Sequence, residues 1–317
     1  RVCNRRCEDA CTRGKIDQAV AIDEVKKFIA QKDLDAATRY VPPIQPPSNR
    51  GGFDDKIAIV GAGPAGLSCA FFLAKKGYKP TVFEKNARPG GMLVYGIPSY
   101  KLEKDVVDAE IEVLRQMGVE IRCNVEVGRD VTLDELRAQG YKAFYLAIGC
   151  QGGRMAGIPG EDAEGVTTAV EFLHRVSEDE TTPVRGRAVV IGGGNVAIDV
   201  ARSCLRCGAD AVAMYCLEQE NQMPASPEEI AEARQEGAVI HCGWGPSRIL
   251  QENGKVTGVE FKRCVSVTDA NGRFAPVYDE NDTMTVPCDQ VFMSIGQSIQ
   301  WGGLLTGSTV QLGGGRR

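Results

Sequence analysis

Two glycine-rich turns carry the residues best suited to chemistry in this 317-residue chain. Residues 61–66 read GAGPAG and residues 192–197 read GGGNVA, and each turn follows a short apolar strand pattern and precedes a helix pattern. Glycine at such a junction lets the backbone approach a pyrophosphate, while the unpaired N–H groups of the helix end face the phosphates. One such turn is a weak signal. Two in one chain predict redox chemistry, with a flavin in one half and a nicotinamide in the other.

The first turn has the residues of a flavin nucleotide site. Gly61 permits the tight turn, Gly63 the approach to the pyrophosphate, and Gly66 the packing of the helix on the sheet. Glu84 lies 18 residues after Gly66, at the end of the next predicted strand. A carboxylate there can accept hydrogen bonds from ribose hydroxyls. Together these features predict FAD; the alternative is a strand–helix turn that binds no nucleotide.

The elements that must position both turns alternate between strand and helix patterns. We expect strands at residues 56–60, 80–83, 188–191 and 211–215, and helices from each turn to about residues 76 and 207. Gly77 and Gly208 follow these helices as natural C-terminal caps. The alternation predicts an α/β fold of two Rossmann-like domains, whose parallel sheets are covered on both faces.

Two similar apolar strands that end at Gly149 and Gly296 bracket the second turn. We interpret them as crossovers, so that the second domain is inserted in the first. The predicted divisions are a helical segment at 1–40, a proline-rich linker at 41–53, an FAD-binding domain at 54–154 and 291–317 that is truncated at its C-terminal end, and an NAD(P)-binding domain at 155–290.

Composition limits the class of protein. The hydrophobic content of 43% and charged content of 25% are typical of a globular protein. The net charge of −5 argues against nucleic acid as a partner. No apolar run approaches the roughly 20 residues that span a bilayer, and no signal-peptide pattern occurs, so we expect a cytoplasmic protein with no membrane partner. The start at Arg1 and the GGGRR end indicate a segment excised from a longer protein.

Residues 84–104 (EKNARPGGMLVYGIPSYKLEK) resemble the flavin-contacting stretch of the glutamate synthase small-subunit family. That family includes related modules of dihydropyrimidine dehydrogenase and of electron-bifurcating transhydrogenases. The resemblance extends from Arg1 to about Gly296 and implies domains like those of glutathione and thioredoxin reductases. It implies that FAD is surrounded by Gly90, Gly91, Leu93, Gly96, Ile97 and Pro98. The remaining predicted FAD positions are Gly61, Gly63, Pro64, Ala65, Gly66, Glu84, Lys85, Val127, Gly149 and Gly296.

Two residues in this stretch need separate comment, one because it differs from the family's usual residue and one because its role has two interpretations. Met92 stands where family members often have leucine. Lys101 has two readings of equal weight: a cation near the flavin that favours its reduced form, or a solvated lysine at a helix start. We assign no residue as a catalytic acid or base. Hydride transfer between nicotinamide and flavin needs none, because the protein supplies stacking and orientation.

The second turn matches the family's nicotinamide loop, with Asn195 where many relatives carry aspartate. NADPH carries a 2′-phosphate that needs cations at the end of the second strand, where many NADPH-using relatives place two arginines. This chain instead has the acids Glu218 and Glu220 there. We therefore predict NADH over NADPH, unless Arg202 or Arg206 reaches the phosphate from the preceding helix. The predicted nicotinamide positions are Gly192, Gly193, Gly194, Asn195, Val196 and Glu218.

Three closely spaced cysteines near the start, Cys3, Cys7 and Cys11, suit an iron–sulfur cluster, because soft thiolate ligands select iron–sulfur or zinc. In the family a similar stretch works with a further upstream cysteine group to hold two [4Fe–4S] clusters. That upstream group is absent here, so we expect [4Fe–4S] binding in the full-length protein. A zinc site or free thiols are the alternatives.

The other cysteines suggest one alternative chemistry. Cys204 and Cys207 have the spacing of a redox dithiol, but they fall in the last turn of a predicted helix, with Cys204 toward the core. The single cysteines are predicted to be buried small hydrophobic residues: Cys69, Cys123, Cys150, Cys216, Cys242, Cys264 and Cys288.

The resulting hypothesis is a flavoprotein oxidoreductase module. It passes a hydride from NADH to FAD, and then electrons to iron–sulfur clusters and a partner domain or subunit. The alternatives are a self-contained NADH:disulfide reductase that uses Cys204 and Cys207, and a non-catalytic docking domain. The family's FAD-contacting Gly-Asp motif would lie beyond Arg317, so we expect this segment to hold FAD weakly.

Overall fold

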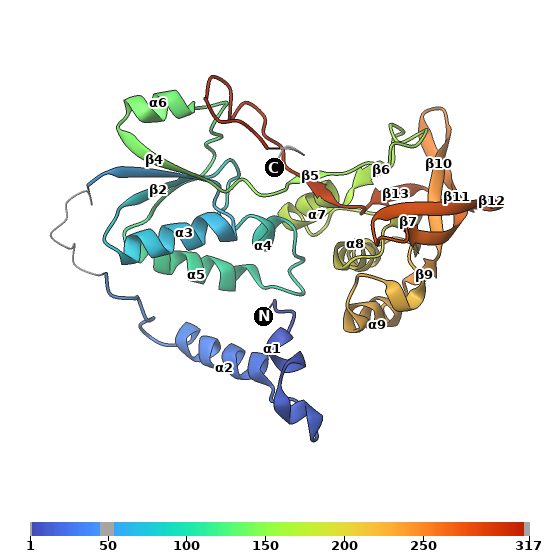
Figure 1. Ribbon diagram of the computed structural model, residues 1–317, viewed down its shortest axis with the longest axis horizontal. Helices are drawn as coiled ribbons and strands as arrows, with labels where there is room; N and C mark the ends of the chain where they lie inside the picture. Colours follow the sequence, from blue (N-terminus) through green and yellow to red (C-terminus); the bar gives the residue numbers. More distant parts are fainter. Residues whose placement is uncertain (1, 45–53, 314–317) are drawn as a thin grey trace. The chain divides into compact units, whose positions relative to one another are not determined.

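The computed structural model describes residues 2–44 and 54–313. Two compact units divide the chain: one contains residues 1–149 and 301–317, and the other contains residues 150–300 (Figure 1). Each unit is built on a parallel sheet, so the α/β fold class is confirmed. No helix in the described ranges combines the length and the apolar character needed to cross a bilayer.

The first unit contains a four-stranded sheet in the order β3-β2-β1-β4. All neighbouring strands are parallel. The bounds are β1 (Lys56–Val60), β2 (Pro80–Phe83), β3 (Glu120–Arg122) and β4 (Tyr141–Leu146). The first two strands have the predicted bounds, because apolar runs between turn residues mark them clearly in the sequence.

Alternating side chains of this sheet bury its two faces. Ile59 and Val82 pack in a core with residues of α3 (Pro64–Lys75) and α5 (Lys104–Gln116). Val60 and Phe83 point the other way, into a core with α6 (Leu133–Ala138) and Leu304. Figure 1 shows α3 and α5 together on one side of the sheet and α6 on the other. The predicted cover on both faces is therefore present.

The N-terminal segment is helical, as expected. It contains α1 (Arg6–Asp9), the 3-10 turn η1 (Thr12–Lys15) and α2 (Ile22–Leu34). Arg39 attaches it to α5, because its guanidinium donates to the carbonyl of Ala109 at 2.8 Å and to the carboxylate of Glu110 at 2.8 Å. Residues 45–53 of the predicted linker lie outside the described residues.

The second unit contains a five-stranded parallel sheet in the order β6-β13-β7-β8-β9. The bounds are β6 (Val166–Thr168), β7 (Arg187–Ile191), β8 (Ala211–Cys216), β9 (Val239–Cys242) and β13 (Gln290–Met293). One face packs through Val190 and Phe292 against α7 (Ala169–Glu178) and α8 (Asn195–Arg206). The opposite face packs through Ile191 and Met293 against a second sheet.

That second sheet is antiparallel, and the sequence analysis did not predict it. Its strands are β10 (Trp244–Glu252), β11 (Lys255–Thr268) and β12 (Phe274–Pro287). Trp244, Val259 and Phe261 carry its apolar side into the core of the unit. Two short strands, β5 (Gly152–Gly153) and β14 (Gln297–Ser298), form a separate antiparallel pair.

The return of the chain to the first unit differs from the expected position at residue 291. β13 pairs with β6 and β7 in the second sheet, and the chain returns at Trp301. An apolar strand that ends in glycine has the same pattern in either sheet, so its pairing partners cannot be read from the strand alone.

Candidate cofactor sites

The first glycine turn is shaped by contacts that only glycine permits. Gly61 has φ +104°, and a Cβ there would lie 2.4 Å from the carbonyl oxygen of Ala147. A Cβ at Gly66 would lie 1.9 Å from the carbonyl oxygen of Gly61. Gly63 differs from these two glycines because a side chain there would meet no close neighbour: the nearest atom to an added Cβ would be the Cα of Gly91, at 3.9 Å. The turn therefore has open space at Gly63, beside the N-terminal end of α3, where a pyrophosphate would be received.

Glu84 is a buried carboxyl group held by hydrogen bonds beside this turn. It follows β2, is 3% exposed, and accepts hydrogen bonds from the N–H of Ala62 at 2.8 Å and the N–H of Asn86 at 2.9 Å. The structure thus brings the predicted ribose-binding carboxylate against the predicted phosphate-binding turn. Lys85, the next residue, is exposed.

The predicted flavin loop, residues 90–98, lies against the same turn. The N–H of Gly90 donates to the carbonyl of Ala62 at 2.8 Å. Gly91 has φ +55°, and a Cβ there would be 2.8 Å from the Cα of Gly63. α4 (Met92–Tyr95) follows at once. The structure therefore places the predicted flavin loop against the predicted phosphate-binding turn, and the role of both in binding FAD stays a prediction.

Lys104 is a positioning residue that sequence reasoning missed. Its ammonium group donates to the carbonyl of Leu93 at 2.9 Å and to the carbonyl of Ile97, so it ties the loop to the start of α5. A lysine at the first position of the following helix was the only available signal. Lys101, for which the sequence left open a cation near the flavin or a solvated lysine, is half-buried in the turn before α5.

Three other predicted FAD positions have different surroundings. Val127 is buried in the core that α6 covers. Gly149 has φ +66° and nothing within 4 Å of a Cβ. Gly296 belongs to the second unit, where Arg154 is the residue nearest to its Cβ position. The role of Gly296 at the FAD site stays a prediction.

The second glycine turn repeats the geometry of the first. Gly192 has φ +141°, and a Cβ there would lie 2.3 Å from the carbonyl oxygen of Ser294. Gly194, the N-cap of α8, has nothing within 4 Å of a Cβ. Glu218 lies over this turn, because its Oε2 atom would be 2.9 Å from a Cβ on Gly193. The structure thus places a carboxylate beside an open helix N-terminus in both units.

The segment before α9 (Pro227–Gln235) is attached to the second turn, which sequence reasoning also missed. The Oδ1 atom of Asn195 accepts a hydrogen bond from the N–H of Ser226 at 2.9 Å. The N–H of Ala225 donates to the carbonyl of Gly193 at 3.1 Å. Asn195 therefore holds this neighbouring segment in place, and Val196 beside it is exposed.

Arg202 joins α8 to α9 and is nearly buried. Its guanidinium contacts the carboxylates of Glu229 at 3.8 Å, Glu236 at 2.7 Å, and Glu232. Arg206 also pairs with Glu236, at 2.7 Å. Both arginines are therefore engaged with α9. The contacts give no support to the alternative that they bind the 2′-phosphate of NADPH.

Replacing Arg202 with methionine is expected to lower the free energy of unfolding by about 3 kcal/mol, because it leaves clustered carboxylates without their buried cation. Burial raises the pKa of Glu236, but hydrogen bonds from Arg206 and Arg202 outweigh it and lower that pKa below 4.5. The stabilisation that this ion pair gives to the folded state is thus fully present above about pH 4.5 and falls as the pH drops through the lowered pKa of Glu236.

Urea unfolding of the wild type and the Arg202→Met variant at several pH values measures this loss of stability. Arg206→Met, at a more exposed position, is the control and should cost less than about 1 kcal/mol; equal losses would contradict the argument.

The three N-terminal cysteines are not gathered in the structure. Within residues 2–44 and 54–313, no three Cys, His, Asp or Glu side chains are placed to hold a metal ion. Cys7 lies in α1, but that helix ends at Asp9 and Cys11 precedes η1, so the spacing of four does not put both thiols on one helix face. The residues as they stand do not form a cluster site.

Cys11 is expected to be alkylated faster than the half-buried Cys69. Hydrogen bonds from the backbone of Val20 and Arg13 lower the pKa of Cys11 below 9.0, whereas burial raises the pKa of Cys69. The thiolate is the nucleophile, so Cys11 should reach its half-maximal rate at the lower pH. Iodoacetamide labelling from pH 6 to 10, followed by peptide mass spectrometry, measures both rates. The assignment is wrong if Cys69 reacts first at neutral pH.

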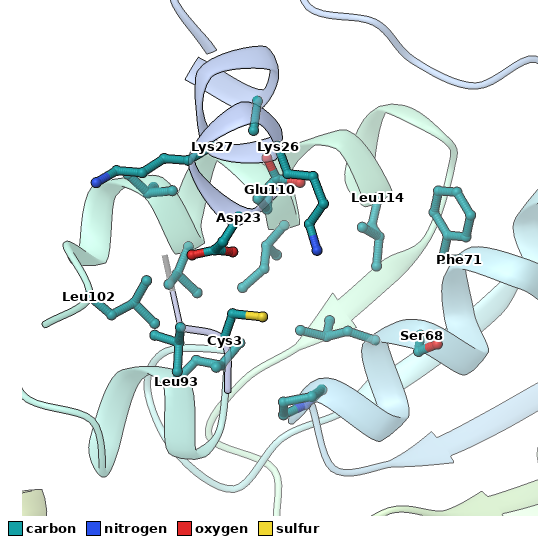
Figure 2. A pocket seen from close by; sticks show the side chains of 17 residues that line it. Cys3, Asp23, Lys26, Lys27, Ser68, Phe71, Leu93, Leu102, Glu110 and Leu114 are labelled. Carbon is teal, nitrogen blue, oxygen red and sulfur yellow. The ribbon is translucent and has the colours of Figure 1, made fainter. Parts of the chain in front are cut away.

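A cavity of about 630 Å³ lies between the N-terminal segment and α3, α4 and α5 (Figure 2). Figure 2 shows the Cys3 thiol and the Lys26 ammonium group directed into it. Pro64 and Leu93, two predicted FAD positions, line its other side. The cysteine-bearing segment therefore lies beside the elements of the predicted FAD site.

The predicted dithiol is not arranged for redox catalysis. Cys204 is fully buried in the α7–α8 core, and burial raises its pKa well above 9.0. Cys207 is the C-cap of α8, and burial raises its pKa as well. Neither thiol is poised as the thiolate that rapid, catalytic disulfide exchange in every turnover requires.

Comparison with known proteins identifies the family. The sequence pattern of the "Pyridine nucleotide-disulphide oxidoreductase" family matches residues 55–315. The chain belongs to the pyridine nucleotide-disulphide oxidoreductase family. This assignment agrees with two Rossmann-like sheets that each carry a glycine turn.

Two curated relatives place the chain within this family. The NADP(+)-dependent formate dehydrogenase subunit beta of Moorella thermoacetica is 38% identical, over 94% of this chain and 45% of its own length. The glutamate synthase [NADPH] small chain of Escherichia coli is 36% identical, over 95% of this chain and 66% of its own length. The predicted resemblance to the glutamate synthase small subunit is confirmed. The chain spans about half to two thirds of the length of these two relatives.

A solved structure of similar fold is that of FprA from Mycobacterium tuberculosis in complex with NADPH. It superposes with a TM-score of 0.64 at 22% identity, over 77% of this chain and 71% of FprA. At this identity the likeness shows a shared fold and no more.

Proposed function

We propose that this chain is the part of an oxidoreductase that binds FAD and NADH, accepts a hydride from NADH, and passes electrons to a partner domain or subunit. One observation carries the proposal. In each unit the glycine at the N-cap of a helix has free space where a side chain would be: Gly63 in the first unit and Gly194 in the second. A carboxyl group at the end of the next strand lies beside that turn, Glu84 in the first unit and Glu218 in the second. This is the arrangement that binds a dinucleotide.

The residues of the first unit fit FAD. The N–H groups at the start of α3 would bind its pyrophosphate beside Gly63, and Glu84 would accept hydrogen bonds from its ribose. The loop that Lys104 fixes would lie against the flavin ring. When bound, FAD supplies the ability to accept a hydride and to release electrons singly. The chain contributes orientation and needs no acid or base side chain for this transfer.

The residues of the second unit favour NADH. Glu218 would accept hydrogen bonds from the adenosine ribose and repel a 2′-phosphate at that place. Arg202 and Arg206 are paired with glutamates of α9. The two relatives described above are named for NADP+ and NADPH. We infer that this chain departs from them because its strand end is acidic.

The N-terminal segment would face the electron acceptor. Cys3 lies in the same cavity as Leu93, so this segment is next to the proposed flavin loop. One relative is named as a subunit and another as a small chain, which supports an electron-accepting partner. Cys3, Cys7 and Cys11 are proposed as ligands of a [4Fe–4S] cluster in the full-length protein only, and no step proposed here passes through them.

The test is anaerobic titration of the FAD-reconstituted protein with NADH and, separately, with NADPH, while the flavin absorbance is followed. We expect bleaching at a lower concentration of NADH than of NADPH. Bleaching by NADPH alone would overturn the coenzyme preference. Failure of both coenzymes to bind, measured by calorimetry, would overturn the proposed function and favour a docking domain. The disulfide-reductase alternative predicts loss of activity in Cys204→Ser, whereas the present proposal predicts full flavin reduction in that variant.

A further inference from the structure

Cys216 and Cys242 form a thiol pair at the edge of the second nucleotide turn. They are direct register partners at the carboxyl ends of the parallel strands β8 and β9, and their Sγ atoms are 3.8 Å apart. The preceding partners, Tyr215 and His241, stack on each other with ring centroids 4.6 Å apart. Side chains alternate along a strand, so the two thiols share the face opposite to that stack.

The backbone of this pair suits a disulfide. Neighbouring strands lie about 4.8 Å apart, within the Cα separation of about 4.4–6.8 Å that a disulfide requires. The sulfur atoms need to approach from 3.8 Å to about 2.05 Å, which side-chain rotation and a small strand shift can supply. Cys216 is buried, whereas Cys242 is partly exposed and open to a small oxidant.

The same thiols lie at the predicted coenzyme contacts. The Cβ of Cys216 would be 2.9 Å from a Cβ on Gly193, so this side chain packs directly beside the turn. The N–H of Gly243, the residue after Cys242, donates to the carbonyl of Glu218 at 2.9 Å. Any movement of the pair is therefore transmitted both to the turn and to the carboxylate proposed to bind ribose.

We propose that Cys216 and Cys242 form a reversible disulfide that weakens coenzyme binding at the second glycine turn. The effect on binding rests on the function proposed above, whereas the disulfide does not. With hydrogen peroxide as oxidant, the sulfur of Cys242 attacks peroxide and becomes a sulfenic acid, with release of one water. The sulfur of Cys216 then displaces a second water and forms the S–S bond. The two thiols lose two electrons, which reduce peroxide to water; a dithiol reductant returns them by exchange.

This inference changes the prediction that both residues are only buried small hydrophobic residues. Met223 also contacts the pair, with its Sδ atom 3.7 Å from the Sγ of Cys242. Burial raises the pKa of Cys242 and that of Cys216, so both are thiols at neutral pH and oxidation is slow. Coenzyme binding and oxidation oppose each other by the same factor, because a linkage between two equilibria is reciprocal.

The experiment treats the 317-residue chain with hydrogen peroxide and maps disulfides by isotope-coded alkylation and mass spectrometry. The dissociation constant for NADH is then measured by calorimetry before oxidation, after it, and after dithiothreitol. We expect a 216–242 disulfide, a dissociation constant raised about fivefold or more, and recovery on reduction. Cys242→Ser should abolish the change. Cys288→Ser, which removes a buried thiol of the same unit, should retain it.

The outcomes separate the two proposals. Absence of a 216–242 disulfide from the folded protein overturns the inference, even if NADH binds well. A disulfide that leaves NADH affinity unchanged overturns the coupling. If the reduced protein binds no coenzyme, the proposed function and the coupling both fail, while the disulfide map still decides whether the pair is a redox site.

Discussion

Gly63→Ala is expected to weaken FAD binding while leaving the first unit folded. A Cβ at this position meets only the Cα of Gly91 at 3.9 Å, so the fold has room for it. The same methyl group would occupy the space where the pyrophosphate approaches the backbone. We expect FAD affinity to fall by about tenfold to a hundredfold, equivalent to an overlap cost of about 1–3 kcal/mol. Calorimetric titration with FAD and thermal unfolding measure the two effects separately.

Gly66→Ala is the matched control, because it adds the same methyl group to the same turn. Its Cβ would lie 1.9 Å from the carbonyl oxygen of Gly61, so the helix and the turn must separate. We expect a fall in stability of about 3 kcal/mol or more. If Gly63→Ala unfolds the protein as strongly as Gly66→Ala, the open space at Gly63 is structural and the assignment of this turn to a nucleotide is wrong.

Glu218→Arg is expected to reverse the coenzyme preference. Loss of the carboxylate removes hydrogen bonds to the ribose and should weaken NADH binding by about tenfold, or about 1.4 kcal/mol. A guanidinium over the second turn should strengthen NADPH binding by about the same factor, through charge-assisted contacts with the 2′-phosphate. Dissociation constants for both coenzymes, measured at fixed ionic strength, test the change.

Two further variants identify the cause. Glu218→Gln keeps the shape and removes the charge, so it should relax repulsion of NADPH without reaching the affinity of the arginine variant. Glu220→Gln changes an exposed acid that pairs with Arg234 at 2.6 Å, and it should leave the preference unchanged. An equal shift in Glu220→Gln and Glu218→Gln would show that general charge, and not the place of Glu218, sets the preference.

Much of the fold could be predicted from local pattern. The strands at 56–60 and 80–83 are apolar runs that end at turn residues, and the glycines that follow the helices fix where those helices end. The antiparallel strands β10 to β12 escaped prediction because their burial alternates irregularly and charged residues interrupt it. Pairing between strands is a property of the whole chain, which explains why β13 pairs within the second unit and the chain returns at Trp301 and not at residue 291.

In the candidate sites, too, features set by local sequence could be predicted, whereas contacts between distant segments could not. Glycine spacing predicted where Gly63 and Gly194 leave open space, because sterics at a turn are local. The tether of Lys104 and the pairing of Cys216 with Cys242 depend on distant segments that meet only after folding. Cys3, Cys7 and Cys11 are not brought together among the described residues, because α1 ends at Asp9, before Cys11. Their role as cluster ligands stays a prediction.

The late return of the chain at Trp301 has a consequence for synthesis on the ribosome. Leu304 completes the core on one face of the first sheet, and the carbonyl oxygen of Gly128 lies so close to Gly303 that a Cβ there would be 2.4 Å from it. The second unit is one uninterrupted stretch, residues 150–300, and emerges whole before those residues do. The first unit therefore begins to fold first but finishes last. Until the residues around Leu304 have been translated, the face of its sheet that carries Val60 and Phe83 lacks part of its apolar cover.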